Sequence, residues 1–103
     1  MKRSIQAVVA FALLALLGTA FSQSVVNAIR ERGELRCGVN QTLPGFGYVD
    51  ESGQFQGFDI DFCRALAAAV LGDPDAVFYR ALTAGERPTA LQSGEIDVLI
   101  RNT

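Results

Sequence analysis

The sequence predicts an α/β fold: a mostly parallel sheet with flanking helices and one short β-hairpin. Residues 34–40 alternate apolar and polar side chains, as a half-buried strand does. Residues 58–71 place apolar side chains at helical spacing, and two later apolar runs, 77–82 and 96–100, are separated by a second helical pattern at 86–93. Strands separated by helices imply right-handed crossovers and parallel pairing.

Residues 1–22 have the features of a secretory signal peptide. Two basic residues are followed by an apolar segment at 5–17 and then by small residues. The alternative, an uncleaved membrane anchor, is disfavoured because a span needs about 20 apolar residues. We expect cleavage after Ser22, or failing that after Ala20, which leaves residues 23–103 as the mature part.

The composition of the mature part excludes several classes of protein. Its 81 residues (103 minus 22) carry 7 arginines, because two of the 9 basic residues lie in the signal, against 11 acids, a net charge of −4. Proteins that bind nucleic acids or anionic membrane surfaces carry clustered positive charge, so the net negative charge disfavours both classes. The chain has no histidine, which excludes a histidine-based triad and makes a zinc site unexpected. We predict no metal, no cofactor, no nucleic-acid partner and no stable membrane insertion after cleavage.

The first elements of the mature part follow from local signals. Residues 24–32 have helical spacing, with Ser24 to cap the helix and Gly33 to end it. The strand at 34–40 comes next. A Pro-Gly pair then predicts a loop over 41–45.

Residues 46–57 are predicted to form the hairpin, with its turn at 50–53. The helix at 58–71 has Asp59 at the N-cap position and Asp61 in its first turn. Its predicted buried stripe consists of Cys63, Leu66, Ala67 and Val70, widened by Phe62 and Leu71. Asp59 and Asp61 could be paired catalytic carboxylates, but their i, i+2 spacing puts them on different sides of a helix, so the capping roles are favoured.

The rest of the chain continues the alternation of strand and helix. A strand is predicted at 77–82 and a helix at 86–93, with Pro88 tolerated in the first turn of that helix. Gly94 closes the helix, and the last strand is predicted at 96–100. No linker divides residues 23–103, which therefore form one unit.

Cys37 and Cys63 are a candidate disulfide pair. Cys37 lies on the first strand, and Cys63 lies on the apolar face of the long helix. A helix that crosses over its own strand would bring them together, and an exported protein is in a compartment that permits disulfides. Such a bridge would stabilise the fold by about 3–4 kcal/mol. Two unpaired buried thiols are the alternative, and a redox-active pair is disfavoured because there is no C-x-x-C motif.

Four aromatic residues crowd one short region: Phe46, Tyr48, Phe55 and Phe58. They could line a pocket or form ordinary hairpin core, and core is favoured for the group. Phe46 is the best pocket candidate, because it follows Pro44 and Gly45 directly off the end of a strand.

Three segments together resemble one family: LRCGVNQTLPGF (35–46), GFDIDFCRALAAAVLGDP (57–74) and ALQSGEIDVLIRNT (90–103). They look like the amino-terminal lobe of the periplasmic amino-acid-binding proteins of ABC importers, solute-binding protein family 3. The pairing of CGVN with GFDIDFCRA, and of SGEID with RNT, is similar to the general L-amino-acid-binding branch.

The resemblance implies a two-lobed clamshell that closes on an L-amino acid and delivers it to the membrane permease of an ABC transporter. It implies a periplasmic, monomeric and non-enzymatic protein. Residues 23–103 would form part of lobe one only. Three alternatives stay open: a sensory or receptor module built on the same lobe, a small self-sufficient secreted domain, and an exported dehydratase of the same fold. The dehydratase would need a general acid or base in its cleft.

The resemblance also implies binding residues. Asn40 matches the polar ligand-binding position at the end of the first strand. Leu43 stands where the family has an aromatic that stacks on the ligand, so Phe46 is the substitute candidate. Asn102 and Thr103 begin the segment whose main-chain groups hold the ligand. The arginine that clamps the carboxylate would lie beyond Thr103 and is not Arg101, so we expect the 103-residue chain alone to be incomplete for binding.

Overall fold

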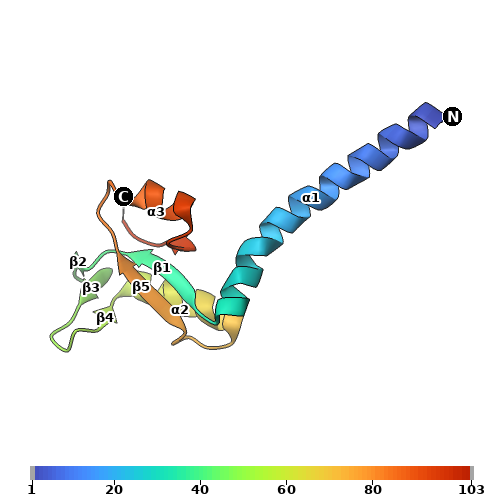
Figure 1. Cartoon of the computed structure of the whole chain (residues 1–103). Coiled ribbons are helices and arrows are strands. Elements are labelled where there is room, and N and C mark those ends of the chain that lie inside the picture. Colours follow the sequence, from blue (N-terminus) through green and yellow to red (C-terminus); the bar gives the residue numbers. More distant parts are fainter. Residues whose placement is uncertain (1, 103) are drawn as a thin grey trace.

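The computed structural model describes the backbone of residues 2–102 and the side chains of residues 2–12 and 24–102. Along this part the chain forms, in order, α1 (Lys2–Arg32), β1 (Leu35–Val39), β2 (Thr42–Leu43), β3 (Gly47–Val49), β4 (Phe55–Gln56), α2 (Phe58–Leu71), β5 (Val77–Ala81), α3 (Arg87–Ser93) and β6 (Val98–Leu99). Figure 1 shows a folded body from which α1 projects, with the end of the described chain beside α3.

The predicted parallel sheet is confirmed, and β1 is its central strand. The strand order is β5–β1–β6, and β1 runs parallel to both neighbours. Successive side chains of a strand point to opposite faces. Cys37 and Val39 therefore pack against α2 on one face, while Gly38 lies under side chains on the other. A Cβ on Gly38 would come within 2.7 Å of the Ile96 Cδ1 and 2.9 Å of the Leu82 Cδ1, so a larger residue would have to displace these side chains.

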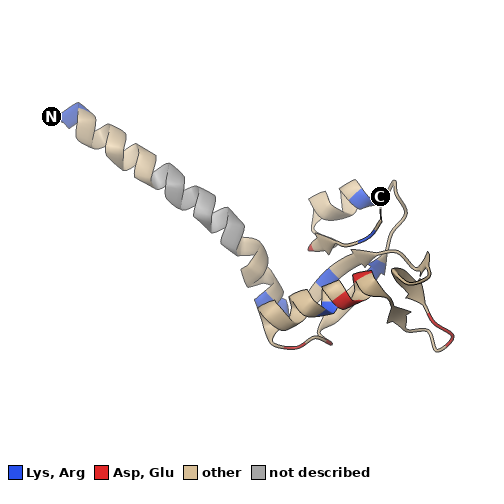
Figure 2. Cartoon of the chain, turned by 180° about the vertical axis from the view of Figure 1, so that it is seen from behind, with Lys and Arg blue, Asp and Glu red and all other residues tan. Residues whose placement is uncertain are grey.

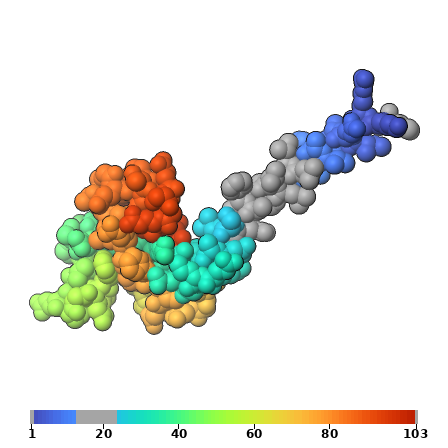
Figure 3. All heavy atoms as spheres, viewed as in Figure 1, coloured from blue at the N-terminus to red at the C-terminus, as the bar shows by residue number. Residues whose placement is uncertain are grey.

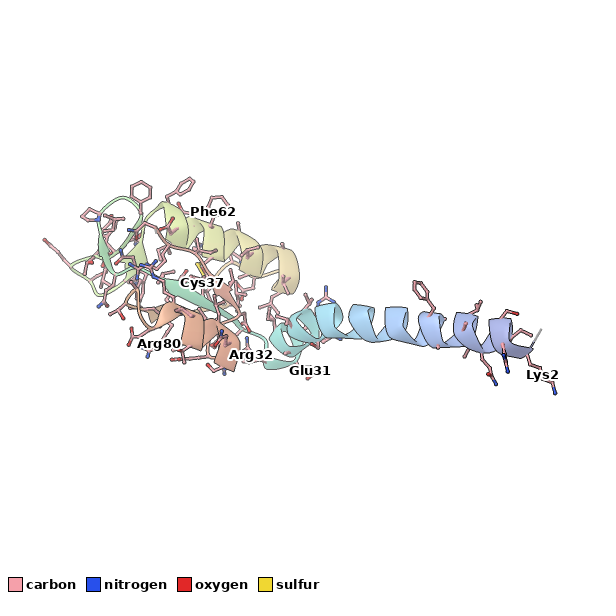
Figure 4. All side chains as sticks on the ribbon, turned by 90° about the horizontal axis from the view of Figure 1, so that it is seen from above. Lys2, Glu31, Arg32, Cys37, Phe62 and Arg80 are labelled. Atoms are coloured by element: carbon pink, nitrogen blue, oxygen red, sulfur yellow. A yellow bond between two sulfur atoms is a disulfide. The ribbon has the colours of Figure 1, made fainter. Side chains whose placement is uncertain are left out.

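Helix α2 has the predicted bounds but turns a different stripe toward the sheet. Ile60, Cys63 and Ala67 are 3%, 0% and 0% exposed and form its buried face. The prediction that Leu66 and Phe62 join this face is wrong, since they are 38% and 51% exposed. Figure 4 shows the Phe62 ring pointing away from the sheet. The sequence pattern allowed either rotation, and packing against β1 selects the one centred on Cys63.

The N-cap of α2 is Gly57, and the prediction that Asp59 takes this position is wrong. Gly57 has φ 121° and ψ 177°, and no side chain caps the helix. Its backbone passes so close to the hairpin that a Cβ would lie 2.1 Å from the carbonyl oxygen of Phe46. This close approach demands glycine and outweighs the capping preference of aspartate. Asp59 lies inside the first turn and is buried, whereas Asp61 is exposed, so the two carboxylates do face different ways.

The predicted disulfide between Cys37 and Cys63 is present. The two Cα atoms lie 6.2 Å apart, and both residues are fully buried. The bridge joins the central strand to α2, as the yellow sulfur atoms beside Cys37 show in Figure 4. The alternative of two free thiols is therefore wrong.

Helix α1 is continuous, so the prediction of a separate helix that begins at Ser24 is wrong. Residues 2–32 contain no proline and are rich in alanine and leucine, which are strong helix formers. Nothing stops the helix before Gly33, whose φ is 73° and whose N–H donates to the carbonyl of Ile29 at 2.8 Å. Ile29 is 4% exposed and packs against Leu35 of the body.

The amino-terminal part of α1 extends away from the body as a rod, which Figure 3 shows in space-filling form. Its tip carries positive charge, and the remaining basic and acidic residues are spread over the body (Figure 2). Among the described residues, no helix is both long enough and apolar enough to cross a bilayer. Cleavage of residues 1–22 stays a prediction.

A partly buried ion pair fixes the carboxyl end of α1 to the sheet. Arg32, labelled in Figure 4, pairs with Asp97, and a carboxylate oxygen of Asp97 also accepts the backbone N–H of Arg36 at 2.8 Å. The side chain of Asp97 is only 9% exposed. The carboxylate thus joins the end of α1, the start of β1 and the segment before β6.

The predicted hairpin is confirmed and gains a third strand. β2 pairs with β3, and β3 pairs with β4, all antiparallel. The prediction that residues 41–45 are only loop is therefore wrong for β2, which is too short to give a sequence pattern. The last strand is shorter than the predicted 96–100, since only Val98–Leu99 is paired.

The aromatic residues of this region do not act as one core. Phe55 is half-buried and stacks on Tyr79 with ring centroids 5.1 Å apart. Phe46 and Phe58 are 50% and 59% exposed and meet edge to face at 6.5 Å. The core interpretation holds for Phe55 and is wrong for Phe58, while Phe46, the pocket candidate, also lies outside the core.

Candidate functional site

The parallel strands end at one edge of the sheet, and a hollow of about 420 Å³ lies there. Helix α2 lies in the connection from β1 to β5, and α3 lies in the connection from β5 to β6. The strands β5 and β6 lie on opposite sides of β1. Open α/β sheets form their binding crevice where the chain changes direction in this way. The volume falls in the range of about 300–1,000 Å³ typical of small-molecule clefts.

The wall of the hollow comes from all three strand ends. Asn40, Gln41 and Thr42 follow β1, Ala81 ends β5 and is followed by Leu82, Thr83 and Glu86, and Arg101 follows β6. Most of these groups are hydroxyl, amide or charged, so the hollow suits a small polar ligand.

Asn40 is the centre of a polar network at the end of β1. Its Nδ2 donates to the Oδ1 of Asn102 at 3.0 Å. Its Oδ1 accepts the backbone N–H of Thr42 at 3.1 Å and the Thr42 hydroxyl at 3.2 Å. The structure therefore brings two of the predicted binding residues together, although they are 62 positions apart. This contact holds the ends of β1 and β6 side by side.

The other predicted binding residues lie elsewhere. Leu43 is half-buried in β2, and Phe46 is half-exposed beside Phe58; neither lines this hollow. Their roles in binding stay predictions. Thr103 lies outside the described residues.

Sequence reasoning missed Thr83 and Glu86. The Glu86 carboxylate accepts the backbone N–H of Thr83 at 2.7 Å and its hydroxyl at 2.9 Å. These two bonds, the backbone one first, lower the pKa of Glu86 below its ordinary value of 4.5. A signal was available, because Thr83 directly follows the predicted strand at 77–82 and strand ends form the crevice.

Arg101 also lines the hollow. Its guanidinium donates to the carbonyl of Leu82, so the side chain spans the end of β1 from β6 to β5. Burial lowers the pKa of Arg101, the positive charge of Arg87 lowers it further, and Asp59 acts in the opposite direction. The sequence placed this residue near the site only by its position after a strand.

The described residues contain no group of three or more cysteine, aspartate, glutamate or histidine side chains that could hold a metal ion. The polar groups of the hollow are instead amides, hydroxyls, one carboxylate and one guanidinium.

The comparisons with known proteins agree on one family. The family described as bacterial extracellular solute-binding proteins, family 3, matches residues 35–103. The general L-amino acid-binding periplasmic protein AapJ of Rhizobium johnstonii is 50% identical over 99 residues, which cover 96% of this chain and 29% of AapJ.

Solved structures share the fold. A periplasmic binding protein of an ABC transporter from Brucella ovis, with glutathione bound, is 52% identical, with a TM-score of 0.72 over 76% of this chain and 24% of that chain. The arginine-bound form of domain 1 from TmArgBP is 32% identical, with a TM-score of 0.65 over 74% of this chain and 58% of that chain. The chain thus spans less than a third of the length of AapJ and of the Brucella ovis protein.

Proposed function

Since this chain belongs to the bacterial extracellular solute-binding proteins of family 3, we propose that the whole protein binds L-amino acids outside the cytoplasmic membrane and delivers them to an ABC transporter permease. Two relatives support this proposal: AapJ is a general L-amino acid-binding periplasmic protein, and YhdW of Escherichia coli K12 is a putative amino-acid ABC transporter-binding protein. The chain contributes residues of the first of two lobes, and the ligand lies between the lobes until hinge movement releases it.

The observation that carries the proposal is the polar network at the strand ends. Asn40 and Thr42 present amide and hydroxyl groups beside the hollow, and Thr83 presents a hydroxyl from the neighbouring strand. Oxygens of these groups can accept from an α-ammonium group, and N–H and O–H groups can donate to an α-carboxylate. The hollow therefore matches the two charged groups that every free amino acid carries.

We propose binding without catalysis. Glu86 and Arg101 are the titratable residues that line the hollow. The hydrogen bonds from Thr83 lower the pKa of the Glu86 carboxylate. A carboxylate whose pKa is lowered is a poor proton acceptor at neutral pH, whereas general acids and bases work best with a pKa near the operating pH. This supports a binding protein over the dehydratase alternative.

Export fits the same proposal. Residues 1–22 are removed as a signal peptide, and the mature protein acts in the periplasm as a monomer that docks on the permease. Amino-terminal sequencing of the exported protein is expected to begin at Gln23, or at Phe21 for cleavage after Ala20. A mature protein that still begins at Met1 would contradict this step and favour a membrane-anchored receptor.

Replacing Asn40 by alanine is expected to weaken L-amino-acid binding by the whole protein about ten- to a hundredfold. A hydrogen bond to a charged ligand group contributes about 1.5–3 kcal/mol, and each 1.4 kcal/mol is a factor of ten. Calorimetric titration of the purified whole protein with mixed and then single L-amino acids measures the effect.

Gln92→Ala is the matched control, because Gln92 is an exposed amide on α3 that does not line the hollow. It should bind as the unaltered protein does. Failure of the unaltered protein to bind any amino acid would overturn the proposed function. If Asn40→Ala binds amino acids as tightly as the unaltered protein does, Asn40 does not contact the ligand. In the same titration, residues 23–103 alone are expected to bind weakly; micromolar binding would show that this part suffices, as domain 1 of TmArgBP holds arginine.

A further inference from the structure

Arg101 is a cation in the wall of the hollow that forms no ion pair with a carboxylate in the described part of the chain. Ion pairs within the described part of the chain involve Arg32, Arg64 and Arg80, and none of them involves Arg101. Its Nε is buried and has no hydrogen-bond partner among the described residues. One end of the guanidinium donates to the Leu82 carbonyl, which holds the group in place across the strand ends.

The charges around Arg101 do not cancel. Arg87, at the start of α3, repels it, and Asp59 attracts it from α2. Two guanidinium groups against one carboxylate leave one positive charge unbalanced. The Nε of Arg87 and the Oδ2 of Asp59 are likewise buried without partners in the described structure.

Glu86 does not supply the missing negative charge. Its carboxylate accepts two hydrogen bonds from Thr83, and the positive charge that lowers its pKa is that of Arg80. The group is fully exposed, so water screens its charge. Arg101, in contrast, is partly desolvated, and electrostatic interactions of a desolvated group are stronger.

An amino acid with a neutral side chain carries no net charge and cannot balance this site. An amino acid with a second carboxylate carries one net negative charge at neutral pH. A guanidinium group also matches the two oxygens of a carboxylate with paired N–H donors. The inference that follows rests on the proposed function.

We propose that Arg101 contacts the second carboxylate of the ligand, so that the hollow selects dicarboxylic amino acids over neutral amino acids of the same size. Arg101 is then a specificity-determining residue and is separate from whatever group holds the α-carboxylate. Arg87 adds to the positive potential at Arg101, and Asp59 limits it.

L-Glutamate and L-glutamine test this proposal, because they differ in charge and hardly in size. Calorimetric titration of the whole protein at pH 7 is expected to give at least tenfold tighter binding of glutamate. Arg101→Gln should remove this preference by weakening glutamate binding, with glutamine binding nearly unchanged. Arg101→Lys keeps the charge and should retain part of the preference. Arg64→Gln is the control, because Arg64 is an exposed arginine on α2 that pairs with Asp75.

The outcomes separate the two proposals. No binding of any amino acid overturns the proposed function and this inference with it. Glutamine bound as tightly as glutamate by the unaltered protein overturns only the inference. If Arg101→Gln weakens the binding of both ligands equally, Arg101 either binds the α-carboxylate or stabilises the fold, and the inference is wrong. Should Arg101→Gln fail to fold, the glutamate preference of the unaltered protein and its partial retention in Arg101→Lys decide the question.

Discussion

Replacing Cys37 and Cys63 together by alanine is expected to lower the free energy of unfolding of this lobe by about 3.5 kcal/mol. The bridge closes a sequence separation of 26 residues, and the chain-entropy estimate for such a loop gives this magnitude. Native domains have only about 5–15 kcal/mol of stability in total, so the loss is large. The bridge also joins β1, which ends at Asn40, to α2.

Urea denaturation of the whole protein, followed by far-UV circular dichroism, measures this effect. The Cys37→Ala/Cys63→Ala variant should unfold at a clearly lower urea concentration than the oxidised protein. Adding a thiol reductant should shift the unaltered protein toward the variant and leave the variant where it is. A variant that unfolds at the same urea concentration as the oxidised protein would show that the bridge contributes no stability.

Replacing Gly57 by alanine is expected to destabilise the lobe by at least about 3 kcal/mol. Gly57 has φ 121° and ψ 177°, a region of backbone conformation that is essentially restricted to glycine. The new Cβ would meet the Phe46 carbonyl oxygen at 2.1 Å. That oxygen cannot move freely, because it accepts the N–H of Asp59 at 2.9 Å. Strain and overlap therefore add.

Gly53→Ala is the matched control for Gly57→Ala. Gly53 also has a positive φ, 83°, but nothing lies within 4 Å of its added Cβ. Its substitution should cost about 1 kcal/mol, the ordinary penalty of left-handed backbone. Chemical denaturation of both variants compares the two costs. Equal destabilisation by the two substitutions would show that the hairpin can move away from Gly57 and that the close approach is not fixed.

The contrast between Gly57 and Asp59 shows why the N-terminus of α2 could not be placed from the sequence. Aspartate is a preferred N-cap, and Asp59 lies at the start of the apolar pattern. The deciding contact is between Gly57 and Phe46, which belongs to the hairpin. A contact between two elements cannot be recognised from the local sequence of either element.

The rotation of α2 has the same cause. The apolar residues Phe62, Leu66 and Ile60 are all consistent with a helix, and any of them could face a core. The bridge and the packing of β1 turn Ile60 inward, and Phe62 is left exposed.

Some residues of the candidate site could be predicted from the sequence, and others could not. Asn40 follows a strand whose pattern is clear, and the resemblance to the family pointed to it. Thr83 and Arg101 also follow strands, but only the parallel arrangement of β5, β1 and β6 brings them to one hollow. The hydrogen bond between Asn40 and Asn102 likewise depends on the pairing of β1 with β6.

The sequence by itself determined the kind and order of the elements after Gly33 other than β2, the parallel sheet and the family, and it offered Cys37 and Cys63 as a candidate disulfide pair. These follow from periods of 2 and 3.6 residues, from glycine and proline positions and from short motifs, all of which act over a few neighbouring residues. The tertiary structure alone decided which face of α2 is buried, why residue 57 must be glycine, and how the hollow acquires Arg101. These features depend on the close approach of segments far apart in the chain. The steric fit and the charge balance at each place are set by the contacting residues, and no local sequence pattern identifies which residues will meet.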